Sequence, residues 1–443
     1  MYVEPAPTYG ELLDRLGAEA VVRVLPRSTA DDGGRYLHWD KLRRLDPPGD
    51  LSHEEWWLAI VLGRDRRPIP LTDPEGNRFS YCLPDEVLKH LHYIDQRCAG
   101  EVAMDEVVTS EREAGRRFLV NSLMEEAIRS SQLEGATTSR AVAKELLRSG
   151  REPRDRSERM IVNNYRAMQF MREEMGTVLT PEALLEVHRI LTEGTLADPE
   201  AAGRIQRPGE ERVKVYDRDD GRPIHIPPPA EQLPERIERL CAFANGDEGE
   251  DRFVHPVVRA VLLHFWLAYD HPFVDGNGRT ARILFFWKMH AEDYWLAEYL
   301  PISRLIRKAP AQYARAFMET EADGGDTTYF LIHQLQIVRR AIDDLHRYLR
   351  RKIAEARDME SRLQADGALN GRQLALLTDA IRRPGAVYSF DSHARTHRVT
   401  HETARSDLRR LAERGLLVKR VQRRRHLFSP APDLPRLLRE SGS

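Results

Sequence analysis

Residues 271–282, HPFVDGNGRTAR, bring together several groups that could do chemistry. Gly276 and the glycine two residues later flank Asn277, and glycines let backbone N–H groups approach an anion closely, above all at the N-terminus of a helix. Arg279 and Arg282 are three residues apart, so in the first turn of such a helix they share one face. The pattern predicts a loop that binds phosphates.

Two further side chains of this segment suit nucleotide chemistry. Asp275 is a carboxylate that suits a Mg²⁺ ion bridging phosphate oxygens, and His271 can act as a base near neutral pH. The alternative without a catalytic role is a structural histidine beside a solvated pair of arginines. An HD-type metal site made by His255, His264 and His271 is a further alternative, but it lacks a His-Asp doublet, with His before Asp, and leaves the glycines and arginines unused.

The residues on either side predict the elements that position this loop. Residues 257–269 form an apolar run typical of a buried helix, and residues 280–290 predict a second helix. From about 103 to 345 the pattern is nearly all helical, so we expect a mainly α fold. Residues 212–229 break it, because apolar residues alternate with polar ones on both sides of Asp220-Gly221, which predicts a β-hairpin.

The segment resembles the signature of the Fic family, HPFx(D/E)GNGRxxR, at every specified position, and the resemblance covers about residues 105–345. It implies an all-helical Fic core with a β-hairpin flap, and transfer of AMP from ATP to a Ser, Thr or Tyr hydroxyl of a target protein. By this resemblance, His271 deprotonates the hydroxyl, Asp275 holds Mg²⁺, Asn277 with the amides of Gly276 and Gly278 holds the α- and β-phosphates, Arg279 contacts the diphosphate and Arg282 contacts the γ-phosphate.

The predicted hairpin has a role in this scheme. The edge of a hairpin offers unpaired backbone groups, so a target segment can add to it as a strand that holds its hydroxyl in line. A surface hairpin without this role is the alternative. The residues expected to form the docking flap are Val213, Lys214, Val215, Ile224, His225 and Ile226.

A second motif lies upstream of the helical core. Ser130 and Glu134 are four residues apart on a predicted helix, with Gly135 as its C-cap. A carboxylate in the last turn opposes the helix dipole unless a cation meets it. The stretch resembles the Fic inhibitory motif, (S/T)xxxE(G/N). By that resemblance Glu134 pairs with Arg282 and keeps the γ-phosphate of ATP from docking productively.

Two regions fit the resemblance less closely. Asp323 stands where many Fic proteins carry an asparagine near the adenine, which leaves the contacts to the base and strict ATP preference open. Residues 1–104 predict a helical N-terminal extension similar to that of bacterial Fic proteins, and we assign it no function.

Residues 369–443 predict a separate basic module. They carry 16 Lys or Arg and 7 Asp or Glu, a net charge of +9, so the rest of the chain carries −11 of the total of −2. Helices expected at 372–382, 391–398 and 400–415, followed by two short strands, predict a winged helix-turn-helix behind a helix and linker at 346–368. Its expected partner is double-stranded DNA, with protein docking as the alternative. The expected DNA contacts are Arg405, Arg409, Arg410, Arg423, Arg424 and Arg425.

Composition limits the class of protein. The three cysteines form no CxxC pair, which argues against a zinc ribbon or a disulfide framework and fits a reducing cytoplasm. The N-terminus lacks an apolar signal region, and the apolar runs are too short to span a membrane, so we expect a cytoplasmic protein without a membrane partner. A homodimer is compatible with the sequence.

The leading hypothesis is an auto-inhibited protein adenylyltransferase that uses ATP and Mg²⁺. One alternative is a DNA-binding regulator whose Fic core senses a nucleotide or modifies only itself. Another is a deadenylylating enzyme in which Glu134 positions a water. The sequence does not name the target protein.

Overall fold

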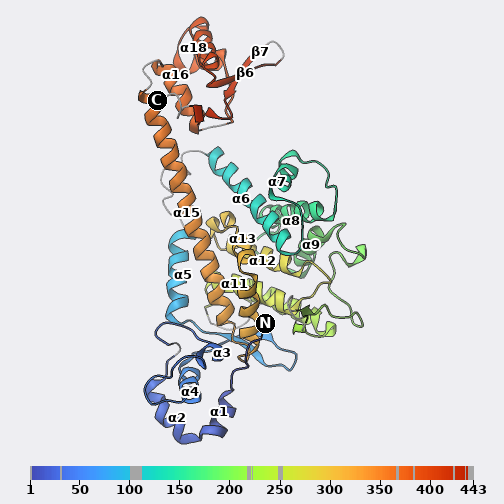
Figure 1. Cartoon of the computed structure of the whole chain (residues 1–443). Coiled ribbons are helices and arrows are strands. Elements are labelled where there is room, and N and C mark those ends of the chain that lie inside the picture. Colours follow the sequence, from blue (N-terminus) through green and yellow to red (C-terminus); the bar gives the residue numbers. More distant parts are fainter. Residues whose placement is uncertain are drawn as a thin grey trace. The chain divides into compact units, whose positions relative to one another are not determined.

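The computed structural model describes residues 2–29, 32–99, 112–216, 221, 223–247, 253–365, 369–382, 385–422, 425–434 and 436–437. The fold is mainly helical, as predicted (Figure 1). The chain divides into two compact units, one of Met1–Val102 and Phe118–Asp343, the other of Ala103–Arg117 and Asp344–Ser443. In the described part, no helix is long and apolar enough to cross a membrane.

The N-terminal part of the first unit contains short helices and one hairpin that was not predicted. Ser52 caps α4 (His53–Gly63) in a capping box with Glu55, which satisfies backbone N–H groups of the first turn and explains why the helix begins there. The hairpin pairs β1 (Arg67–Thr72) with β2 (Arg78–Tyr81). The helical segments are α1 (Tyr9–Leu16), α2 (Ala18–Val24), η1 (Leu25–Arg27), α3 (Trp39–Leu42), α4 (His53–Gly63) and α5 (Asp85–Cys98).

This N-terminal part belongs to the same unit as the helical core rather than standing apart from residue 104 onward. Arg64 explains part of the connection, because its buried guanidinium donates to Asp323 at 2.8 Å and to the carbonyl of Leu37 at 2.8 Å. It also lies over the ring of Trp57, 4.8 Å from the ring centroid. Charge-assisted bonds buried in this way join segments far apart in the sequence.

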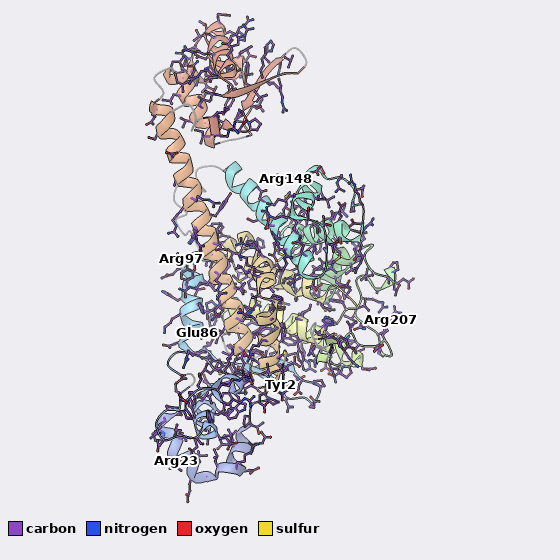
Figure 2. All side chains as sticks on the ribbon, in the orientation of Figure 1. Tyr2, Arg23, Glu86, Arg97, Arg148 and Arg207 are labelled. Carbon is purple, nitrogen blue, oxygen red and sulfur yellow. The ribbon has the colours of Figure 1, made fainter. Side chains whose placement is uncertain are left out.

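The helical core surrounds α11 (Pro256–Asp270) and α12 (Asn277–Ala291), which pack along each other (Figure 1). Both are buried on nearly every face; α11 is mostly apolar, whereas the start of α12 carries buried Asn277, Arg279 and Arg282. Side chains fill the space between the ribbons (Figure 2). The helices α8 and α9 contact α12. The other segments are α6 (Arg112–Leu133), α7 (Arg140–Ser149), α8 (Arg156–Glu173), α9 (Pro181–Thr192), η2 (Pro199–Ala201), η3 (Ala230–Gln232), α10 (Leu233–Asn245), η4 (Trp295–Tyr299), α13 (Ile302–Lys308), α14 (Pro310–Glu321) and α15 (Thr328–Ala365).

The predicted hairpin before α10 is present but short. Strand β3 (Val215–Tyr216) pairs antiparallel with β4 (Pro223–His225), with Val215 opposite His225. Val213, Lys214 and Ile226 lie outside the strands, and residues 217–220 of the expected turn lie outside the described residues.

In the second unit, three helices and two strands lie where the sequence predicts them, and a third strand, β5 (Tyr388–Ser389), was not predicted. Strand β5 and β6 (Leu417–Gln422) both pair with β7 (Arg425–Pro430), which gives the strand order β5-β7-β6. Three helices complete this part, namely α16 (Gly371–Arg382), α17 (Phe390–His397) and α18 (His401–Glu413). Leu377, Leu408 and Phe428 are fully buried in a shared core. The unit therefore has its own hydrophobic core.

Candidate functional site

His271 ends α11 in an unusual conformation. Its φ of 46° and ψ of 52° place it in the left-handed region, which turns the chain sharply into the loop before α12. Nδ1 of its ring is buried and has no hydrogen-bond partner among the described residues. Burial, followed by the positive charges of His225 and Arg212, lowers the pKa of His271 to about 4. The imidazole is therefore neutral at pH 7 and can accept a proton.

Asn277 closes the loop on itself. Its amide oxygen accepts from the backbone N–H of Phe273 at 2.9 Å, and its amide nitrogen donates to the Phe273 carbonyl at 2.7 Å. The sequence assigned this side chain to the phosphates. In the structure it shapes the loop, because both of its polar atoms bond to Phe273.

His188 of α9 supports the same loop and was not identified from the sequence. Its ring stacks on Phe273 with centroids 3.7 Å apart and planes 5° apart. Nδ1 accepts from the N–H of Gly203 at 3.0 Å, so the hydrogen on Nε2 is donated to the carbonyl of Asp275 at 2.9 Å. Burial lowers the pKa of His188 to about 4, which agrees with this neutral form. No local signal marks His188, because it lies 87 residues from Asp275.

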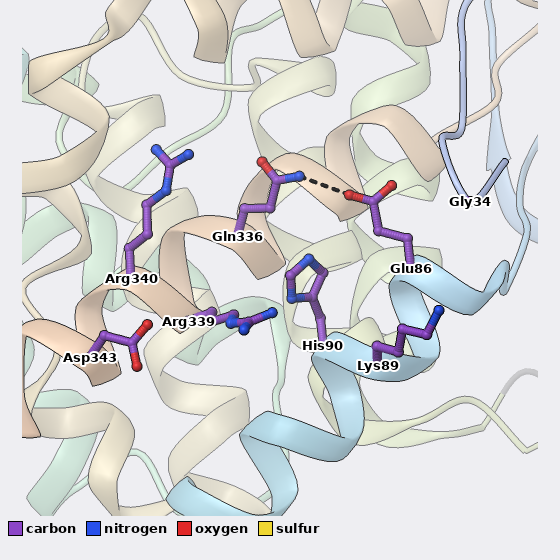
Figure 3. A pocket seen from close by; sticks show the side chains of 8 residues that line it. All are labelled: Gly34, Glu86, Lys89, His90, Gln336, Arg339, Arg340 and Asp343. Carbon is purple, nitrogen blue, oxygen red and sulfur yellow. Dashed lines mark hydrogen bonds between the residues drawn. The ribbon is translucent and has the colours of Figure 1, made fainter. Parts of the chain in front are cut away.

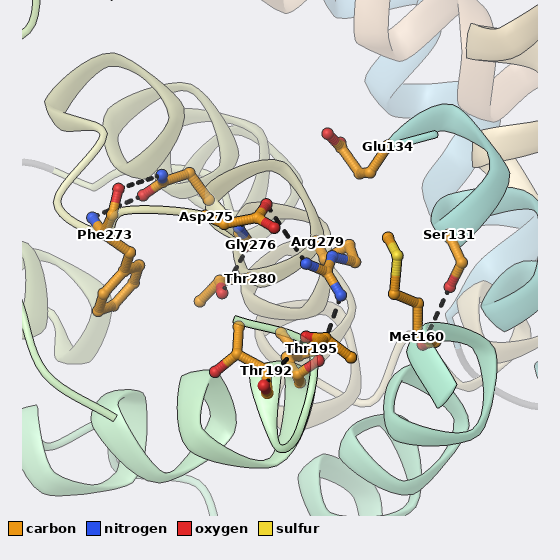
Figure 4. A network of polar contacts seen from close by, with 12 residues as sticks. Ser131, Glu134, Met160, Thr192, Thr195, Phe273, Asp275, Gly276, Arg279 and Thr280 are labelled. Atoms are coloured by element: carbon orange, nitrogen blue, oxygen red, sulfur yellow. Dashed lines mark hydrogen bonds and ion pairs between the residues drawn. The ribbon is translucent and has the colours of Figure 1, made fainter. Parts of the chain in front are cut away.

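The first turn of α12 has the geometry that the sequence predicts for an anion site. Gly276 is its N-cap at a φ of 88°, a conformation that glycine adopts without steric cost, and Thr280 donates to the Gly276 carbonyl at 3.0 Å (Figure 4). The N–H groups at the start of a helix have no acceptor within it, and the helix dipole makes this end positive.

Arg279 is fully buried beneath this turn. Its guanidinium donates to the carbonyl of Leu191 at 3.2 Å and contacts Asp275 at 3.5 Å, while Nε has no partner among the described residues (Figure 4). A buried cation that is only partly satisfied attracts an anion strongly, because few other groups neutralise its charge.

Asp275 faces the same turn from the loop. One of its oxygens accepts from the N–H of Gly276 at 2.6 Å, and the other lies 3.0 Å from Arg156 at the start of α8. Arg156 also donates to the Thr195 carbonyl at 2.8 Å and was not singled out in the sequence. Mg²⁺ commonly uses one or two carboxylates together with substrate phosphates, so a single carboxylate beside a phosphate cradle fits this metal.

Arg282 forms hydrogen bonds with residues of the upstream motif. Its Nη2 donates to Glu134 at 2.8 Å and to the carbonyl of Ser130 at 3.3 Å, and its Nε donates to the Ser130 hydroxyl at 2.9 Å. The Glu134–Arg282 pair that the resemblance implies is therefore present in the structure. The Glu134 carboxylate also lies against Gly278, so closely that a side chain at this position would collide with it. Glu134 thus covers the N-terminal turn of α12.

The turn after α6 presents Glu134 to this site. The helix ends at Leu133, and Gly135 follows at a φ of 97°. Buried Ser131 donates to the carbonyls of Ala127 and Met160, at 2.8 Å and 3.2 Å, which connects α6 to α8. The position of Glu134 therefore depends on how α6 packs.

The flap residues separate into two groups. Ile226 is 59% exposed and Val213 is 36% exposed, so both are accessible to a partner. His225 is buried and bonds to the carbonyl of Tyr269 and to Glu321, so it anchors the flap instead of forming a docking surface. The side chain of Ile224 lies outside the described residues, and Lys214 and Val215 are half-buried.

Asp323 occupies a structural position. Its carboxylate accepts from Arg64, Arg66 and Tyr329 at 2.8, 2.7 and 2.7 Å. Burial is the largest single influence on the pKa of Asp323 and raises it. The two arginines and the Tyr329 hydrogen bond together outweigh burial, so the pKa is lowered. Its partners belong to the connection with the N-terminal part rather than to a site for the base.

Two cavities accompany these features. One of about 640 Å³ is lined by Arg156 and Thr195 together with neighbouring residues, so it borders the candidate site at Asp275. The other, of about 480 Å³, lies between α5 and α15 (Figure 3) and shares no residue with the predicted site. Its lining residues are Gly34, Glu86, Lys89, His90, Gln336, Arg339, Arg340 and Asp343.

The expected DNA contacts of the second unit are partly described. Arg409, Arg410 and Arg425 are exposed and Arg405 is half-buried, whereas Arg423 and Arg424 lie outside the described residues. Burial and the charges of Lys419, Arg409 and Arg405 lower the pKa of His426 in β7, so the basic residues of α18 and β6 lie close to one another there.

Comparison with known proteins identifies the part of the chain that holds this site. Residues 178–288 match the family model of the Fic/DOC family, and this part of the chain is a Fic/DOC domain. A protein adenylyltransferase Fic from Nematostella vectensis is 34% identical over 106 residues, which are 24% of this chain and 22% of that protein. One from Drosophila melanogaster is 35% identical over 106 residues, 24% of this chain and 19% of that protein. The chain thus matches about a fifth of these relatives' length.

Solved structures give weaker similarities. A Fic family protein from Desulfovibrio desulfuricans G20 superposes with a TM-score of 0.47 at 18% identity, over 78% of this chain and 95% of that one. Fic-1 (aa134–508) from C. elegans gives a TM-score of 0.44 at 21% identity, over 59% of this chain and 71% of that one.

Proposed function

We propose that the Fic/DOC domain of this chain transfers AMP from ATP to a Ser, Thr or Tyr hydroxyl of a protein. The observation that carries the proposal is the convergence of a neutral His271, the first turn of α12 and the buried Arg279 on one loop. Such a site provides a base, an anion cradle and a fixed positive charge, which are the requirements for transfer of a phosphorus group.

In the proposed step, the target hydroxyl donates its proton to His271 as its oxygen attacks the α-phosphorus of ATP. A new P–O bond forms to the target, the bond between the α-phosphorus and the bridging oxygen breaks, and diphosphate leaves. His271 suits this role because its lowered pKa of about 4 keeps it unprotonated at neutral pH. The N–H groups at the start of α12 and the guanidinium of Arg279 stabilise the negative charge of the phosphates.

Asp275 is the residue that would hold Mg²⁺ in this scheme. The ion supplies positive charge to the phosphate oxygens when it is bound. Asp275 is partly exposed, so its carboxylate is accessible to an ion from solvent.

We also propose that Glu134 holds this site in an inhibited state. Its carboxylate covers Gly278 at the positive end of α12 and engages Arg282, so it takes a position that suits the phosphates of ATP. A charge-assisted bond of this kind contributes roughly 1.5–3 kcal/mol. Glu134 then competes with the γ-phosphate for Arg282.

The exposed flap residues are the proposed docking edge for the target. Val213 and Ile226 are accessible beside the short strands, and the backbone of a target segment can pair there. Recognition through backbone groups would position the hydroxyl without reading much of the target sequence.

A second proposed function, DNA binding by a winged helix in the second unit, is favoured by the gathering of Arg405, Arg409 and Lys419 around His426. Removal of residues 369–443 is expected to abolish a gel shift with double-stranded DNA, and binding by the full chain is expected to weaken steeply as salt rises. A gel shift that survives the truncation would assign the binding elsewhere.

Intact-mass spectrometry tests the proposed activity. The Glu134→Gly variant, incubated with ATP and Mg²⁺, is expected to add the mass of one or more adenylyl groups to itself or to a protein substrate. A deadenylylating enzyme would instead remove this mass from a pre-modified protein in a reaction that needs Glu134. A regulator that only senses the nucleotide would bind ATP without any change of mass.

A further inference from the structure

The flap contains a buried histidine whose two ring nitrogens both face oxygen atoms. His225 lies on β4 and is 9% exposed. Its Nε2 is 2.6 Å from the carbonyl oxygen of Tyr269 at the end of α11. Its Nδ1 is 3.1 Å from Oε1 and 3.1 Å from Oε2 of Glu321, at the end of α14.

These contacts favour hydrogens on both ring nitrogens of His225. A carbonyl oxygen only accepts hydrogen bonds, so Nε2 must carry a hydrogen. An ionised carboxylate also only accepts, so Nδ1 must carry one as well. Glu321 is 30% exposed, so water solvates its charged form. Both ring nitrogens of His225 therefore face acceptors, an arrangement that suits an imidazolium ion.

Other charged groups surround this ion on α11, α10 and the segment before β3. Asp270 is buried, and it accepts from Arg236 at 2.8 Å and from Trp266 at 2.9 Å. Arg212 donates to the carbonyls of Asp270 and His271, at 2.6 Å and 3.1 Å. The ring of Tyr269 lies 4.7 Å from the His225 ring, between centroids. Asp270 and Glu321 balance these cations.

The charge of His225 reaches the proposed base. After burial, the positive charge of His225 is the largest influence that lowers the pKa of His271, and that of Arg212 follows. A like charge nearby disfavours protonation of an imidazole. His271 thus owes part of its unprotonated state at neutral pH to a residue on the flap.

We propose that His225 is a positioning residue for the transfer reaction: as an imidazolium ion paired with Glu321, it fastens the flap strand β4 to α11 and α14 and keeps His271 unprotonated. This inference rests on the proposed function, because it assigns His271 as the base. The inference connects the docking of the target strand with the protonation state of His271, because His225 affects both.

The protonation state of His225 can be measured without any activity. Two-bond ¹H–¹⁵N NMR spectra of the ¹⁵N-histidine-labelled full chain distinguish an imidazolium ion from either neutral tautomer, and His225→Gln assigns the signal. We expect the imidazolium pattern at pH 7, and a neutral pattern in Glu321→Gln, whose amide can donate to Nδ1. Glu186→Gln, an exposed carboxylate paired with Arg189, is the matched control and should change nothing. A neutral His225 at pH 7 in the unmodified chain would overturn the inference.

The pH dependence of AMP transfer tests the link to His271, measured in the Glu134→Gly background. The acidic limb of kcat/KM should lie at or below the His271 pKa of about 4, because this background lacks Glu134, whose charge raises that pKa. In His225→Gln, whose amide still reaches the Tyr269 carbonyl but carries no charge, this limb should move up by about one pH unit. His225→Lys restores a charge and should move the limb back. An unmoved limb in folded His225→Gln would overturn the inference.

If the proposed function is wrong, the experiments give a different result from the one that would overturn the role of His225. A chain that transfers no AMP in any variant contradicts the proposed function, while the NMR spectrum still reports whether His225 is charged.

Discussion

The loop that begins α12 and the hairpin that precedes it in the sequence are held in different ways. Within the loop, Asn277 bonds to Phe273 and Thr280 to Gly276, each four residues away. The hairpin has strands of two and three residues, and His225 anchors it to partners 44 and 96 residues away. The loop therefore closes on itself by local contacts, which His188 and Arg156 supplement from α9 and α8, whereas the flap depends on the packing and charge of distant helices.

The largest expected effect belongs to the loop. In the Glu134→Gly background, His271→Ala should lower the rate of AMP transfer by about 10²- to 10⁴-fold, because the reaction loses its base. ATP binding, measured by calorimetry, should stay within a few-fold, since His271 does not bind the phosphates. Transfer at an undiminished rate would remove His271 from the mechanism.

Release of Glu134 should have the next largest effect. Glu134→Gly should raise auto-modification about 10- to 100-fold, the change expected when a bond of roughly 1.5–3 kcal/mol no longer competes with ATP. Arg282→Ala breaks the same pair but should not activate, because the γ-phosphate then loses its ligand. Glu125→Gln, on the same helix and paired with Arg129 and Arg140, is the control and should leave the rate unchanged.

If Glu134→Gly is no faster than the unmodified chain, the inhibitory contact does not limit the reaction. Equal activation by Arg282→Ala would show that the pair restrains something other than the γ-phosphate.

The local character of the loop predicts a cost in stability. Asn277→Ala leaves the buried N–H and carbonyl of Phe273 without their partner, which should lower the free energy of unfolding of the first unit by about 1–3 kcal/mol. Chemical denaturation monitored by tryptophan fluorescence measures this free energy of unfolding. Asn77→Ala, in an exposed turn where Asn77 bonds to Asp73, should cost less. Equal costs would mean that the loop does not depend on Asn277.

The smallest effect is expected at the accessible part of the flap. Ile226→Asp adds a charge at an exposed position beside β4, so it should raise KM for a protein target a few-fold and leave KM for ATP unchanged. Leu88→Asp, on an exposed face of α5, is the control. Unchanged target kinetics in Ile226→Asp would place the docking surface elsewhere.

The sequence predicts well what depends on neighbours in the chain. The two central helices, the glycine turn between them and the helices of the second unit follow from local patterns of apolar residues, caps and turns. It does not reveal His188 or Arg156, which reach the loop from α9 and α8, because nothing in their own surroundings marks them. Asn277 and His225 show a related limit. Their types fit the proposed chemistry, but their side chains bond elsewhere in the fold.

The position of the label transferred from ATP tests the central claim most directly. The Glu134→Gly variant is incubated with Mg²⁺ and with ATP labelled either at the α- or at the γ-phosphate, alone and with candidate target proteins. We expect covalent label from α-labelled ATP only, and its loss when His271→Ala is added. Covalent label from γ-labelled ATP, or none from α-labelled ATP, would contradict the assignment of this site to AMP transfer.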